Sequence, residues 1–142
     1  MRAVIGLGSL TALFIMGYWI AVFLGAFPVP ELVPGYRAWF MAFPVADGWI
    51  GLWAALAAFA AWRRRESVRR YALLAGSGLV FLGLYAMTYG ITTGLICRAT
   101  LDEYVEIGIK VYCLGVGGFF VALGLQGPET EVSITTPFVC PP

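Results

Sequence analysis

The chain contains a single lysine, Lys110, which lies inside a long apolar segment that begins near Glu103. An ammonium group at membrane depth costs several kcal/mol unless it is paired or hydrated, so an intramembrane lysine marks a candidate functional site. Glu106 lies four residues earlier, on the same helical face and in the favourable acid-before-base order. This spacing predicts an ion pair within a membrane-spanning helix.

Polar side chains in the other apolar segments fall at a similar predicted depth, counted at about 1.5 Å per helical residue. We expect them to form a polar layer in the outer half of the membrane, in which Glu106 and Asp47 neutralise Lys110 and hydroxyl groups complete its hydrogen bonding. The candidate layer comprises Lys110, Glu106, Asp47, Tyr18, Tyr85, Tyr89, Thr92 and Glu103. Three interpretations stay open: a structural ion pair, a cavity for a small ligand or lipid headgroup, and a lipid-facing lysine that extends to the surface.

Several other chemistries are disfavoured. Histidine is absent, which removes histidine-ligated metals and haem and histidine acid–base catalysis from this chain. The cysteines Cys97, Cys113 and Cys140 form no CxxC pair, so no redox motif or zinc site is predicted. The net charge of +1 indicates no nucleic-acid partner, and we expect no cofactor.

The composition predicts an all-α integral membrane protein. Hydrophobic residues make up 61% of the 142 residues and charged residues only 12%, whereas soluble domains are nearer half and a quarter. A span needs about 20 apolar residues. The apolar runs predict four spans, at about 3–26, 44–62, 71–97 and 103–126. We expect them to form an antiparallel four-helix transmembrane bundle, one domain over 1–126.

Arginine sets the expected orientation. Five arginines lie between the second and third spans, namely Arg63, Arg64, Arg65, Arg69 and Arg70. The positive-inside rule places this loop and both chain termini in the cytoplasm. The same arginines are candidate contacts for anionic lipid or a partner protein.

Two segments outside the spans carry further expectations. Aromatic residues with one arginine over 36–43 favour a short helix in the outer membrane interface, with an irregular aromatic anchor as the alternative. Residues 127–142 contain a strand-like stretch but are too short to fold alone. We expect an extended cytoplasmic tail that a partner could hold.

Three blocks, 43–47, 84–90 and 102–110, together resemble uncharacterised small four-span bacterial integral membrane proteins. The resemblance implies a multi-pass protein of the bacterial inner membrane, and it implies no activity.

We expect the chain to be a non-catalytic accessory or structural subunit of a larger membrane complex, whose partners are the lipid bilayer and other subunits or further copies of itself. The alternative is a small-ligand or lipid-binding or transport protein that uses the polar layer around Lys110. An enzyme with Asp47, Glu106 or Lys110 as acid or base is the least favoured interpretation, since no nucleophile or metal site accompanies them.

Overall fold

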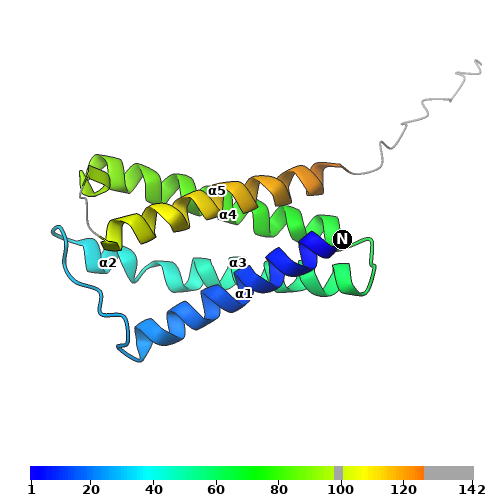
Figure 1. Ribbon diagram of the computed structural model, residues 1–142, viewed down its shortest axis with the longest axis horizontal. Helices are drawn as coiled ribbons and strands as arrows, with labels where there is room; N and C mark the ends of the chain where they lie inside the picture. Colours follow the sequence, from blue (N-terminus) through cyan, green and yellow to red (C-terminus); the bar gives the residue numbers. More distant parts are fainter. Residues whose placement is uncertain (98–100, 127–142) are drawn as a thin grey trace, which may run out of the picture.

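The computed structural model describes residues 1–97 and 101–126, and the side chains of 1–97 and 104–126. Every regular element in this part of the chain is helical (Figure 1). The elements are α1 (Arg2–Phe23), α2 (Tyr36–Phe40), α3 (Phe43–Trp62), α4 (Val68–Thr92), the 3₁₀ turn η1 (Leu95–Cys97) and α5 (Leu101–Leu125). The predicted tail over 127–142 lies outside the described residues.

Four of these helices are long and apolar enough to cross a membrane. Large apolar side chains on their outward faces are exposed, including Leu13, Phe23, Val45 and Phe81, each more than half accessible. Water would oppose such surfaces, whereas hydrocarbon accepts them. The protein is therefore a multi-pass membrane protein.

Local sequence explains where the helices begin and end. Pro44 lies in the first turn of α3, where its missing N–H is not needed, and α3 ends at Trp62 immediately before the arginines. The third predicted span, 71–97, is interrupted near its end. Helix α4 stops at Thr92, and Gly94 adopts φ +70°, a conformation that favours glycine, before η1 begins.

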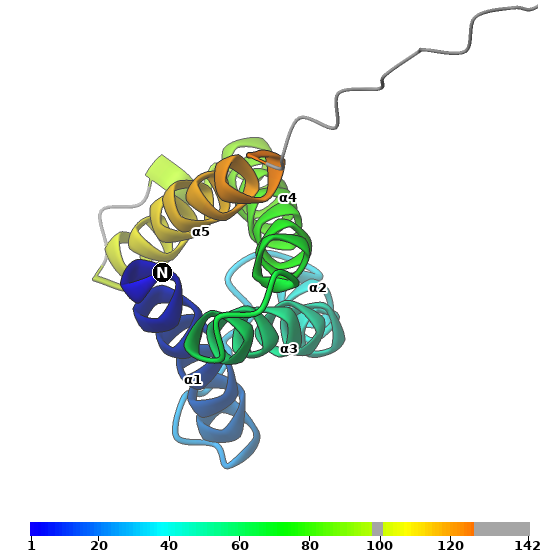
Figure 2. The same cartoon turned by 90° about the vertical axis from the view of Figure 1, so that its right-hand side faces the viewer.

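The long helices pack in the series α1 on α3, α3 on α4 and α4 on α5, as the end-on view shows (Figure 2). Small residues allow these close contacts. A Cβ at Gly8 of α1 would lie 2.7 Å from the carbonyl oxygen of Ala54 in α3. A Cβ at Gly76 of α4 would lie 2.8 Å from the backbone of Gly117 in α5. The first and last helices of the series, α1 and α5, make few contacts with each other in the described residues.

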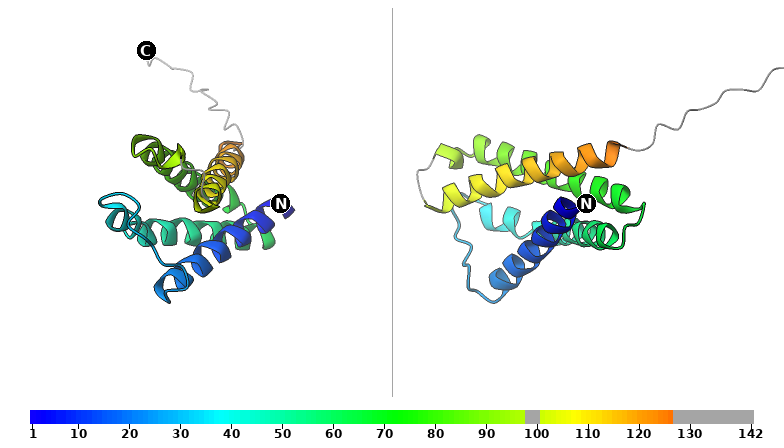
Figure 3. Two further views of the ribbon diagram at one scale, coloured as in Figure 1. Left: turned by 60° about the vertical axis from the view of Figure 1, so that its left-hand side comes forward. Right: turned by 45° about the vertical axis from the view of Figure 1, so that its right-hand side comes forward.

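Helix α2 lies at the end of the molecule where α4 connects to α5, and the α3–α4 connection and the N-terminus lie at the opposite end (Figures 1 and 3). Gly35, at φ +86°, turns the chain into α2. The carboxylate of Glu31 then accepts hydrogen bonds from the backbone N–H groups of Gly35 and Arg37, at 2.5 and 3.1 Å. These bonds occupy N–H groups that a helix start leaves unpaired, so they stabilise the short helix.

Candidate functional site

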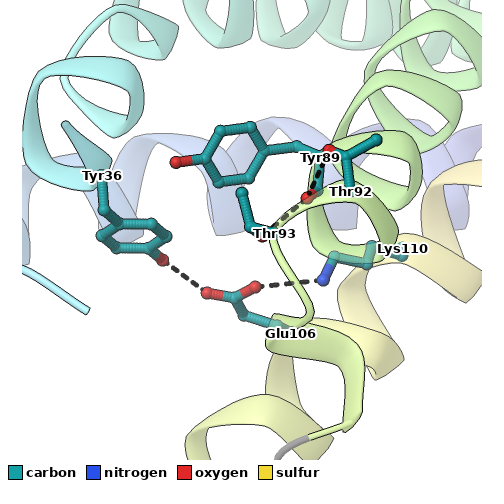
Figure 4. A network of polar contacts seen from close by, with 6 residues as sticks. All are labelled: Tyr36, Tyr89, Thr92, Thr93, Glu106 and Lys110. Atoms are coloured by element: carbon teal, nitrogen blue, oxygen red, sulfur yellow. Dashed lines mark hydrogen bonds and ion pairs between the residues drawn. The ribbon is translucent and has the colours of Figure 1, made fainter. Parts of the chain in front are cut away.

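The lysine and glutamate of α5 pair as their spacing predicts. The Lys110 Nζ atom lies 3.1 Å from Glu106 Oε2 (Figure 4). The lysine side chain is only 5% exposed and the glutamate side chain 29%. A charge buried to this degree needs a paired countercharge and further hydrogen bonds to be tolerated.

A second bond to Glu106 comes from α2. The hydroxyl of Tyr36 donates to Glu106 Oε1 at 2.6 Å, and the tyrosine is 3% exposed (Figure 4). Gly90 of α4 gives the ammonium room, since a Cβ there would lie 3.3 Å from Lys110 Nζ. The ion pair is therefore held between α2, α4 and α5.

Asp47 of α3 takes a different partner from the one expected. Its Oδ2 atom accepts a hydrogen bond from Trp19 Nε1 of α1 at 2.8 Å. Its Oδ1 atom is buried and has no hydrogen-bond partner among the described residues. Asp47 thus joins α1 to α3 through an indole and keeps one acceptor atom unused.

The other predicted members of the polar layer are only partly brought together. Tyr89 stacks its ring on Trp39, with centroids 3.8 Å apart, and Tyr85 is exposed. The Thr92 hydroxyl donates to backbone carbonyls of its own helix, at 3.0 Å to Thr88, rather than toward Lys110. A threonine in a helix commonly satisfies its hydroxyl in this way. The side chain of Glu103 lies outside the described residues.

A groove of about 510 Å³ lies between α1 and α5, and α2, α3 and α4 also contribute to its walls. This volume lies within the usual range of ligand sites. Among the described residues, the charged side chains that line it are Asp47, Glu106 and Lys110, and the rest of this lining is largely apolar. Leu10 and Phe14 of α1 and Val105 of α5 line the groove and are also more than half exposed. The groove therefore opens sideways, toward the bilayer.

Aromatic rings surround the end of the groove next to α2. The ring centroid of Phe40 lies 5.4 Å from that of Trp19, 6.0 Å from that of Tyr36 and 6.3 Å from that of Tyr18. All four rings line the groove, as do the indole of Trp39 and the ring of Phe43. The carboxylate of Asp47 lies among them, bonded to Trp19.

A hydrogen bond joins α1 and α5 at the opposite end of the groove. The hydroxyl oxygens of Thr11 in α1 and Tyr112 in α5 lie 2.7 Å apart, and Thr11 also donates to the carbonyl of Leu7 at 2.8 Å. Because Leu7 accepts the threonine proton, the tyrosine is the donor between the two hydroxyls. This bond links α1 to α5 across the groove.

The arginine loop lies away from the groove. Arg63, Arg64, Arg65, Arg69 and Arg70 are all exposed. The guanidinium of Arg63 lies over the ring of Trp62, 5.0 Å from its centroid. These side chains are free to meet lipid headgroups or a partner. In the described residues, no group of three or more Cys, Asp or Glu is arranged to hold a metal ion.

Comparison with protein-family models, with curated proteins and with solved structures finds no match to this chain. What the site can do is therefore argued from its own geometry.

Sequence reasoning missed four residues of the site: Tyr36, Trp19, Thr11 and Tyr112. Tyr36 and Trp19 could have been identified from their residue types, because a buried tyrosine hydroxyl or tryptophan N–H usually has a hydrogen-bond partner. The carboxylates of Glu106 and Asp47 are such partners. Thr11 carries a weaker signal, as the only threonine of its span. The partner of each residue depends on how α1 and α2 pack, which spacing along the chain does not specify.

Proposed function

We propose that this protein binds an amphipathic molecule in the groove between α1 and α5, with the polar head of the ligand at the α2 end and its apolar body between the helices. The observation that carries the proposal is the groove itself, which joins apolar walls to a cluster of charged groups at one end. Apolar sites with a few convergent polar groups are the usual form of ligand pockets.

Two details support a ligand over a purely structural ion pair. Within the part of the chain that the structure describes, the buried Asp47 Oδ1 and Trp39 Nε1 atoms have no hydrogen-bond partner, and both residues line the groove. Buried polar groups are almost always bonded, so a bound head group would account for them. The sideways opening also gives a molecule dissolved in the bilayer a direct route in.

We further propose that the four long helices form an antiparallel bundle in a bacterial inner membrane, with the arginine loop and both termini in the cytoplasm. Helix α2 then lies in the outer interface, and the groove opens into the outer leaflet. The positive-inside rule supports this orientation, because the exposed arginines gather in the α3–α4 connection and the first turn of α4.

Two glycines of α5 allow a matched test of binding. Gly108 lines the groove, Gly115 does not, and a Cβ at either would meet no atom within 4 Å. We expect Gly108→Leu to place a side chain in the groove and to remove most lipid adducts seen by native mass spectrometry of protein from its native membrane. Gly115→Leu should keep them. Equal retention in both variants would contradict the proposal.

The accessory-subunit role remains a second candidate, because α5 presents an outward small-residue face. Gly115 and Gly118 are exposed and lie on one helical face, at i and i+3. Such a face suits close packing with a helix of another subunit. This role predicts that larger membrane proteins co-purify with the wild type in mild detergent and are lost in Gly118→Leu. A monodisperse protein without partners would contradict it.

A further inference from the structure

We infer that the ligand of the groove carries a protonated ammonium head, and that Asp47 and the surrounding aromatic rings recognise it. This inference rests on the proposed function and adds the chemical class of the ligand. The occupant to which we commit is an ammonium-bearing amphiphile that enters from the bilayer.

The charges that line the groove favour a cationic ligand. The charged side chains of the described groove lining are two acids and one base. Lys110 lies beside Glu106, at 3.1 Å, which leaves Asp47 without a cationic partner among the described groove residues. Among these residues, the bond that Asp47 accepts comes from the neutral indole of Trp19, and its buried Oδ1 atom accepts none. A half-buried carboxylate with an unbonded oxygen favours a positively charged ligand.

The aromatic rings near Asp47 also favour a cationic ligand. Tyr18, Trp19 and Phe40 have centroids 5.4 to 6.3 Å from one another and line the same groove as Asp47. Aromatic faces attract cations, and the attraction grows when both are removed from water. Clusters of rings are the usual recognition element for ammonium groups. A carboxylate set among rings therefore selects a cation over a neutral or anionic head.

The apolar walls of the groove favour a ligand with a hydrocarbon body. Its walls beyond the charged end are apolar side chains of α1, α4 and α5, such as Ile15, Leu82 and Ile109. These walls would contact a hydrocarbon body while the ammonium lies beside Asp47. A small hydrophilic amine would leave them uncovered, so an amphiphile fits better than a soluble polyamine.

Three probes with the same twelve-carbon chain test the inference: dodecylamine, dodecanol and dodecanoate. At neutral pH the first is a cation, the second is neutral and the third is an anion. Dodecylamine and dodecanol can both donate a hydrogen bond, so they differ in charge rather than in donor capacity. Binding to the full-length protein in a neutral detergent is titrated by native mass spectrometry.

We expect dodecylamine to bind at least ~10-fold more tightly than dodecanol, which corresponds to about 1.4 kcal/mol. Asp47→Asn should abolish this preference while keeping an oxygen that can accept the bond from Trp19. Glu66→Gln, which removes an exposed acid of the arginine loop, should retain the preference. If Asp47→Asn does not fold, Phe40→Leu serves in its place. It removes one ring face, and we expect it to reduce the preference for dodecylamine over dodecanol about threefold.

The possible failures are distinguishable. If dodecanol or dodecanoate binds as tightly as dodecylamine, the ammonium inference is overturned and the groove remains a ligand site. A preference for dodecylamine that persists in Asp47→Asn also overturns it, since the charge would then act elsewhere. If no probe binds, or if Gly108→Leu leaves the binding of every probe unchanged, the proposed function itself fails.

Discussion

At the scale of single residues, Lys110 is defined by what surrounds it. Its ammonium lies against Glu106, and the glutamate is in turn held by Tyr36 from α2. Removing one member of a buried pair is costly mainly because the other charge stays behind. The contribution of this site to the free energy of unfolding therefore depends on Lys110 and Glu106 together.

This sharing can be measured with a double-mutant cycle. We expect Lys110→Met to lower the free energy of unfolding by on the order of 3 kcal/mol, because Glu106 then lacks its countercharge. Lys110→Met with Glu106→Gln should lie closer to the wild type than Lys110→Met alone. Unfolding in mixed micelles, followed by tryptophan fluorescence, provides the values. Additive losses would show that the two side chains are not coupled.

Tyr36 permits a second prediction at this scale. Tyr36→Phe keeps the ring and removes the hydroxyl that donates to Glu106 at 2.6 Å. Hydrogen bonds to charged groups contribute about 1.5–3 kcal/mol, and we expect a loss of stability in that range. Tyr104→Phe is the matched control, since Tyr104 is 65% exposed on the same helix as Glu106. Equal effects of the two substitutions would argue against the role of the Tyr36 bond.

The residue scale also shows what spacing along the chain can predict. The Lys110–Glu106 pair follows from the i, i+4 rule alone, because both atoms belong to one helix. The partner of Asp47 does not, since Trp19 reaches it from another helix. Thr92 shares a predicted depth with Lys110, yet its hydroxyl donates to its own helix. Spacing along the chain predicts a pair within one helix, whereas the direction in which a side chain meets another helix depends on how the helices pack.

At the scale of elements, α4 and α5 form the tightest pair. Glycines lie where the two helices cross, and a Cβ at Gly76 would come within 2.8 Å of the α5 backbone. A neighbouring backbone cannot rotate aside as a side chain can. The close approach of these helices therefore depends on glycine.

A single methyl group tests this dependence. We expect Gly76→Ala to reduce stability by about 1–3 kcal/mol, the usual cost of overpacking. Gly115→Ala adds the same methyl group where no atom lies within 4 Å, and it should be nearly neutral. Unfolding in mixed micelles compares the two variants. A neutral Gly76→Ala would mean that the helices can separate without cost.

Elements also show where sequence prediction stops. The predicted span 44–62 matches α3 (Phe43–Trp62) closely, because proline and the arginine run mark its two ends. The break after Thr92 was missed, since the residues on both sides are apolar enough to continue the span. The docking of α2 onto the rings of α1 and α4 involves contacts between distant parts of the chain, and no local pattern encodes it.

At the scale of the whole molecule, orientation decides which leaflet can supply a ligand. The turn η1, which ends at the exposed Cys97, lies at the end of the molecule that holds α2, and the α3–α4 connection lies at the other end. With the arginine loop in the cytoplasm, as we propose, the groove would be reached from the outer leaflet. The side on which each loop lies would then decide which leaflet supplies the proposed ligand.

Cysteine labelling tests the orientation. In right-side-out vesicles, we expect a membrane-impermeant maleimide to label Cys97 in a Cys113→Ala, Cys140→Ser background. A cysteine introduced by Ser67→Cys, with Cys97→Ser in the same background, should react only after the membrane is opened. The reverse pattern would place the arginine loop outside and contradict the positive-inside assignment.

The hydrogen bond between Thr11 and Tyr112 sets the length of the groove. It joins α1 to α5 at the end of the groove opposite the charged side chains, so a ligand bound as proposed would meet these two hydroxyls at the end of its chain. A chain that ends short of the two hydroxyls would fit, and a longer chain would have to bend outward between the helices. Selectivity for chain length would then come from this one threonine–tyrosine pair, and selectivity for the head group from the other end of the groove.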